Sequence, residues 1–143
     1  MSKSNAFETD ILKLIFNGTS IPGIADNAAA SPLTTYYCAL HTSDPGEAGD
    51  QTTNEISYPG YARVGILRTA GALPVTGGTM APAAAIEFPS QASGGAQSAP
   101  FWSLGTLISG AGKILYSGPV SPPIPITTGV IPVLMVGTTV TED

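Results

Sequence analysis

The sequence predicts a mainly β fold, a jelly roll or β-sandwich of about eight short antiparallel strands preceded by one N-terminal α-helix. Two observations indicate this class. The 17 Gly and 13 Pro residues interrupt the chain every few positions, which excludes long helices after the first segment. Hydrophobic residues make up 43% of the chain, so there is enough apolar surface to bury and disorder is excluded.

The N-terminal segment has the pattern of a capped amphipathic helix. Its apolar residues at helical spacing are Phe7, Ile11, Leu14 and Ile15, and Leu12 and Phe16 widen this stripe, so the helix is expected to be docked. Asn5 is the expected N-cap, with Glu8 three residues later completing a capping box, and Gly18 is the expected C-terminal stop. We therefore predict two parts, a helical arm at residues 1–18 and a β-sandwich domain at residues 19–143.

The rest of the chain alternates between strand-like and turn-like segments. After a loop at 19–33, strands are predicted at 34–40, 61–69, 73–75, 85–88, 101–109, 113–117 and 130–141. An acidic loop is expected up to Asn54 and a flexible stretch at 90–99. Residues 121–126 contain three prolines, which cannot donate to a central ladder, and so this segment is predicted to be an extended edge.

Charge and length restrict the partners. The formal net charge is −5, and no Lys or Arg occurs between Lys13 and Arg63, so the clustered cations of a nucleic-acid binder are missing. The longest apolar stretch, 130–136, is too short to span a bilayer, and no signal peptide is recognised. Cys38 is expected to be a buried strand residue. Only 10% of residues are charged, which favours contacts within an assembly.

An ordered set of motifs follows the predicted helix. They are Tyr37-Cys38-Ala39-Leu40-His41-Thr42-Ser43-Asp44-Pro45, Gly60-Tyr61-Ala62-Arg63-Val64, Ile86-Glu87-Phe88-Pro89, Trp102, and Gly112-Lys113-Ile114-Leu115-Tyr116-Ser117-Gly118-Pro119. Over about residues 6–141 the chain resembles small phage virion proteins labelled "tail fibre-like", and is similar in size and design to jelly-roll cement proteins of phage heads. The small-residue loop at 90–100 departs from that pattern. The resemblance implies a virion component, on the head or on the tail.

His41 is the only histidine, and Ser43 and Asp44 stand beside it. Neighbours along a strand point to opposite faces, so these three residues cannot converge as a hydrolytic triad on their own. We interpret His41 as a strand-end residue bonded to a turn. The expectation is that the protein is not an enzyme, with no catalytic residues and no cofactor.

Three further features each have a structural and a functional interpretation. Asp44, Glu47 and Asp50 are a solvated acidic loop or, as a minority alternative, a Ca²⁺ site; no metal site is predicted. Arg63 pairs with a carboxylate of an adjacent subunit, or within the chain with Glu55 or Glu87. Trp102 is expected in the core rather than as a platform for a host sugar.

These observations lead to a functional hypothesis. We expect a capsid decoration or cement protein that forms a dimer or trimer and bridges major capsid subunits on the exterior of the head. The candidate partner contacts are Phe7, Ile11, Leu14, Ile15, Arg63, Pro122, Pro123, Ile124 and Pro125. The protein would be made in the bacterial cytoplasm and bind neither nucleic acid nor membrane. The alternative is a tail-fibre or baseplate module, serving as an adaptor or binding host-surface glycans. A small hydrolase and a non-phage β-sandwich binding module are less favoured.

Overall fold

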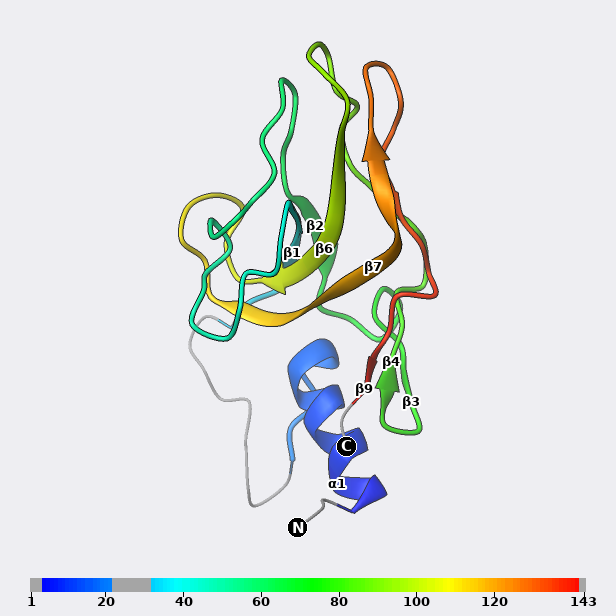
Figure 1. Ribbon diagram of the computed structural model, residues 1–143. Coiled ribbons are helices and arrows are strands. Elements are labelled where there is room, and N and C mark those ends of the chain that lie inside the picture. Colours follow the sequence, from blue (N-terminus) through cyan, green and yellow to red (C-terminus); the bar gives the residue numbers. More distant parts are fainter. Residues whose placement is uncertain (1–3, 22–31, 142–143) are drawn as a thin grey trace. The chain divides into compact units, whose positions relative to one another are not determined.

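The computed structural model describes residues 4–21 and 32–141 (Figure 1). Most of the predicted loop at 19–33 therefore lies outside the described residues. The chain forms two compact units. One comprises residues 36–65 and 86–134, and the other combines the N-terminal segment with residues 66–85 and the C-terminal residues from 135 onward.

A four-stranded sheet organises the first unit. Its order is β2-β1-β6-β7, with β2 at Val64–Leu67, β1 at Thr35–His41, β6 at Gln97–Gly105 and β7 at Ile114–Ile126. The central strand β6 pairs antiparallel with both β1 and β7, and Figure 1 shows β6 and β7 running side by side. Together these strands form the framework on which the loops of this unit are held.

The two central strands carry the core. Residues 38–41 of β1 and 102–105 of β6 are all buried, as expected for strands covered on both faces. Leu40 lies opposite Trp102, and Ala39 lies opposite Ser103. Trp102 is only 6% exposed, so this residue is a core residue. Cys38 is fully buried as well, as predicted.

The Pro-rich segment is part of the long edge strand β7. The prediction of an extended edge is confirmed, because β7 has a hydrogen-bonded neighbour on one side only. Two details were wrong. The strand predicted at 113–117 and the segment at 121–126 are one strand, with an irregularity opposite Pro100 that accommodates the prolines. Residues 97–99, predicted as flexible, pair with the end of β7.

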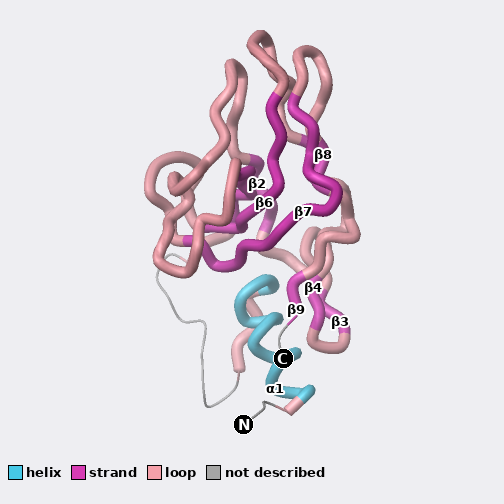
Figure 2. The backbone as a smooth tube through the Cα atoms, viewed as in Figure 1, coloured by secondary structure: helices cyan, strands magenta, loops and turns pink. Residues whose placement is uncertain are grey.

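The short strands form two small sheets. In the first unit, β5 (Ile86–Glu87) pairs with β8 (Val133–Leu134). In the other unit, β3 (Val75–Thr76), β4 (Thr79–Met80) and β9 (Val140–Thr141) pair in that order. The strand predicted at 130–141 is thus two separate strands, β8 and β9. Loops and turns make up much of the chain between them (Figure 2).

The N-terminal helix is present, but its cap differs from the prediction. Helix α1 spans Asn5–Leu12 and continues as a π-helical turn, η1, at Lys13–Asn17. The N-cap is Ser4, whose hydroxyl accepts from the Phe7 backbone N–H at 3.4 Å, whereas Asn5 already belongs to the helix. Gly18 ends the helix in the left-handed conformation at φ 67°, as predicted.

The helix fully buries the two residues that widen the predicted apolar stripe, rather than Phe7 at its start. Leu12 and Phe16 are fully buried, while Phe7 is 37% exposed. The backbone carbonyls of Leu14 and Ile15 accept hydrogen bonds from the Arg68 guanidinium, which places a cation at the negative end of the helix dipole. Packing and capping therefore hold the last helical turn in place.

The predicted fold class is confirmed: the chain is mainly β, with antiparallel sheets and one N-terminal helix, consistent with a β-sandwich, and it has nine described strands. The division into an arm at 1–18 and a sandwich at 19–143 stays a prediction. None of the described helices is long and apolar enough to cross a membrane.

Candidate functional site

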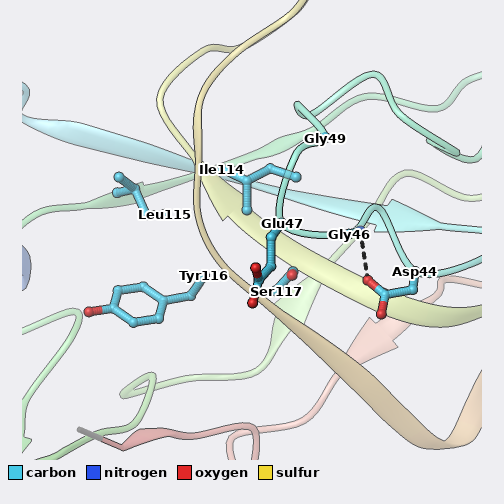
Figure 3. Close-up of a pocket in the computed structure, with 8 residues that line it drawn as sticks. All are labelled: Asp44, Gly46, Glu47, Gly49, Ile114, Leu115, Tyr116 and Ser117. Carbon is cyan, nitrogen blue, oxygen red and sulfur yellow. Dashed lines mark hydrogen bonds between the residues drawn. The ribbon is translucent and has the colours of Figure 1, made fainter.

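A pocket of about 370 Å³ lies between the acidic loop and the edge strand β7. Its lining residues are Asp44, Gly46, Glu47, Gly49, Ile114, Leu115, Tyr116 and Ser117. In the view of Figure 3 the Glu47 side chain extends over β7 toward Ser117, and Ile114 lies between Glu47 and Gly49. The side chains of Leu115 and Tyr116 point away from the two carboxylates. Two carboxylates, a hydroxyl and an aliphatic side chain thus share one concave site.

The carboxylates of the pocket retain hydrogen-bonding capacity. Asp44 Oδ1 accepts from the Gly46 backbone N–H at 2.8 Å, which forms a local turn. Neither Asp44 nor Glu47 forms an ion pair with a residue in the described parts of the chain. Both side chains are exposed. The pocket can therefore accept hydrogen bonds from a ligand and attract a positive charge.

Gln51 holds the acidic loop in place through buried side-chain hydrogen bonds. Its side chain is fully buried, donates to the Tyr37 carbonyl at 3.0 Å and accepts from the Leu107 N–H at 3.1 Å. A Cβ atom on Gly105 or Gly112 would overlap the Gln51 side chain, so glycine at both positions makes room for it. The loop that carries Asp44 and Glu47 is thus bonded directly to β1 and to the β6–β7 connection.

Arg63 is paired within the chain. Its Nε donates to Glu55 Oε1 and its Nη2 to Glu55 Oε2, both at 2.7 Å, which is a bidentate salt bridge. Nη1 and Nη2 also donate to the Leu107 and Gly110 carbonyls at 2.9 Å. The bond to Glu55 raises the pKa of the guanidinium. Of the two interpretations of Arg63, the structure shows the pair with Glu55; contact with a partner stays a prediction.

His41 is fully buried and hydrogen-bonded at both ring nitrogens. Nδ1 lies 2.9 Å from the Thr53 carbonyl, and Nε2 lies 2.7 Å from Ser103 Oγ. Because a carbonyl can only accept, Nδ1 carries the proton, and Nε2 of the neutral ring accepts from the Ser103 hydroxyl. Burial lowers the pKa of His41. Ser103 is also fully buried, so this Ser–His contact is closed to a substrate.

The acidic trio does not come together. Asp50 does not line the pocket, and its Oδ1 accepts from the Thr52 N–H at 2.8 Å and the Thr52 hydroxyl at 2.5 Å. The Thr52 hydroxyl and N–H hold the pKa of Asp50 below its usual value. Within residues 4–21 and 32–141 no group of three or more His, Cys, Asp or Glu residues could hold a metal ion.

The remaining predicted contact residues lie in two places. On the helix, Phe7 is exposed and Ile11, Leu14 and Ile15 are half-buried. On β7, Pro122, Pro123 and Pro125 are exposed, whereas Ile124 is 5% exposed and belongs to the core. Neither group lines the pocket. Their role in partner contacts stays a prediction.

Sequence reasoning missed the part that β7 plays in the site. The sequence marks Asp44 and Glu47 as residues of an acidic loop, but gives Ile114 and Ser117 only the pattern of strand residues. Their proximity depends on the pairing of β6 with β7 and on the anchoring of the loop by Gln51, and neither has a local signal.

The antiparallel framework, the anchored loops and the small open pocket define a β-rich structural or binding module. Residues 2–141 match the model of the family described as Gp80, podophage GP4 fiber I protein gp80. The match covers nearly the whole chain, and the chain belongs to this family. It is therefore a structural protein of a bacteriophage virion. No curated protein matches the sequence.

Proposed function

We propose that the protein is a building block of a fibre on the virion exterior and that it joins other virion proteins to form that fibre. The observation that carries the proposal is the match of residues 2–141 to a family named for a podophage fibre protein. The fold supports it, since rigid, mainly β modules with anchored loops suit a mechanical role. The fibre assignment corresponds to the alternative that the sequence left open, and here it takes precedence over capsid decoration.

The proposal includes the partners. The protein would associate as a homo-oligomer, a dimer or trimer, and contact tail proteins, without binding nucleic acid or membrane. It would have no enzymatic activity. The burial of the Ser103–His41 contact supports the expected lack of hydrolysis, and the net charge of −5 supports the expected lack of nucleic-acid binding. Generic ester and glycoside substrates should give no turnover above background with the purified chain, and turnover lost in His41→Ala would contradict this part.

Capsid decoration is the second candidate. It is favoured by the resemblance to jelly-roll cement proteins and by the low fraction of charged residues, 10%. In that case the protein would bridge major capsid subunits on the head exterior. The exposed prolines of β7 would then be the surface that rests on the shell.

Quantitative mass spectrometry of purified virions, combined with gold labelling of an affinity tag on the protein, separates the two candidates. A fibre component should be present at a small fraction of the major capsid protein and be labelled on projecting fibres. Capsid decoration predicts a copy number comparable with that of the major capsid protein and label over the whole head. The second pattern would overturn the fibre proposal.

A further inference from the structure

We propose that the pocket between residues 44–49 and β7 receives a lysine or arginine side chain of another virion protein. The proposal rests on the proposed function, because it requires the chain to be bound to other proteins of the particle. The cavity of about 370 Å³ is at the small end of the usual range for ligand pockets, roughly 300–1,000 Å³. A single long side chain suits such a space better than a folded surface element would.

The lining matches the two ends of such a side chain. Lysine and arginine bury an aliphatic stem along apolar surface and leave the charged head among polar groups. Ile114 contributes an aliphatic side chain to the pocket lining, and in the view of Figure 3 the Glu47 carboxylate and Ser117 lie below it. Both side chains can accept hydrogen bonds from an ammonium or guanidinium group.

No cation of the described segments forms an ion pair with the carboxylates of the pocket, whereas Glu55 in the same loop is paired with Arg63. Glu55 is neutralised by Arg63, and Asp50 Oδ1 is bonded to Thr52. Asp44 and Glu47 have no cationic partner in the described segments. A positive group entering the pocket would therefore meet two carboxylates that no cation of the chain itself occupies.

A second copy of this chain is poorly equipped to supply that group. It contains five Lys and Arg residues. The guanidinium groups of Arg63 and Arg68 are bonded to their own chain. Of the described lysines, Lys13 is half-buried on η1, and Lys113 is exposed next to the pocket lining. A second copy that offered Lys113 would therefore bring its own Asp44 and Glu47 toward those of the first copy, and these like charges repel one another. The occupant is accordingly assigned to a different, more basic protein.

An NMR titration of the full-length, ¹⁵N-labelled chain tests the proposal with defined probes. N-acetyl-arginine amide and N-acetyl-lysine amide are compared with the citrulline and norleucine amides, which have similar shapes but no charge. We expect the charged probes to shift the amide signals of residues 44, 46–49 and 114–117, and the neutral ones to bind at least severalfold more weakly. Raising the salt concentration should weaken binding, because the site is open to solvent.

Matched variants test the role of the carboxylates. Glu47→Gln should weaken binding about twofold to fivefold, the range for a solvent-exposed ion pair, and Glu47→Lys should abolish it. Glu87→Gln makes the same charge change at an exposed position of β5 outside the pocket lining, and should leave the affinity unchanged. Both positions are exposed, so these variants should fold, which their spectra will show.

Four results would overturn the proposal. The first is that the charged probes fail to shift the pocket signals, and the second is that the neutral probes bind equally well. The third is that a neutral methyl glycoside shifts the same signals while the cations do not, which would make this a saccharide site. The fourth is that the signals shift with protein concentration alone, which would make the occupant a second copy. The virion labelling experiment decides the fibre role independently, so failure of the pocket and failure of the fibre proposal are distinguishable.

Discussion

The buried Arg63–Glu55 pair should be the most destabilising polar contact to remove. The Arg63 side chain is 2% exposed and that of Glu55 is 17% exposed. Besides the bidentate bridge, the guanidinium binds the Leu107 and Gly110 carbonyls, and Glu55 Oε1 also accepts from the Tyr61 hydroxyl at 3.1 Å. Removing one partner of a buried, hydrogen-bonded pair typically costs about 3–5 kcal/mol, because the other charge stays buried and unpaired.

The two single variants should differ in cost. Arg63→Met leaves the partly exposed Glu55, which keeps the Tyr61 hydroxyl, so we expect a loss of about 3 kcal/mol in the free energy of unfolding. Glu55→Gln leaves a cation that is almost fully buried, so we expect this variant to lose about 4–5 kcal/mol in the free energy of unfolding. The double variant should lose about 1–3 kcal/mol less than the sum, because no unpaired charge remains.

Denaturation in guanidinium chloride, followed by tryptophan fluorescence, measures these values. Trp102 is the only tryptophan, lies in β6 of the same unit as the pair, and is 6% exposed, so its emission should shift when this unit unfolds. The slope m must stay constant for the comparison to hold. Lys113→Met, which removes an exposed cation from the β6–β7 connection, is the control and should change stability by less than about 0.5 kcal/mol.

The reasoning would be refuted by either of two results. One is a cost below about 1 kcal/mol for Arg63→Met, which would give the pair the value of a surface salt bridge. The other is strict additivity in the double variant, which would show that the two side chains act independently.

Three further predictions concern buried groups of the same unit. Burial lowers the pKa of His41 from 6.5, so the unfolded chain binds the proton first as the pH falls. The free energy of unfolding should therefore fall by at most about 1.4 kcal/mol per pH unit below neutral pH. Denaturant titrations of His41→Gln at several pH values should lack this dependence on pH. Gly112→Ala should cost about 1–3 kcal/mol in the same titration because its Cβ overlaps Gln51, whereas Gly95→Ala, with open space around it, should be close to neutral. Burial raises the pKa of the Cys38 thiol, so an aromatic disulfide reagent should react with it only after unfolding; rapid reaction of the native protein would contradict its burial.

Local patterns in the sequence were sufficient for the elements whose cause is local. Gly18 ends the helix because a left-handed residue is needed there. The prolines of residues 121–126 restrict that segment to an edge, which is where β7 lies. In each case the backbone chemistry of one residue type decides the structure.

The sequence was insufficient to predict burial and contacts that depend on residues far apart in the chain. The helix has apolar residues on adjacent stripes, and only its packing selects Leu12 and Phe16 over Phe7 as the buried ones. The contact between His41 and Ser103 joins residues 62 positions apart, and Ser43, which the sequence places nearby, is exposed. A polar residue in an acidic loop gives no local sign of burial, as Gln51 shows.

The use of cations inside the fold bears on how the protein can bind partners. Arg63 and Arg68 are two of only five positive side chains. Both form internal contacts: Arg63 pairs with Glu55, and Arg68 donates to carbonyls of the helix. Charged groups at an interface contribute more to specificity and association rate than to affinity. Under the proposal made above, the Asp44–Glu47 pocket would help this surface to distinguish one partner from another. Reversing its charge should therefore alter partner choice more than it alters folding.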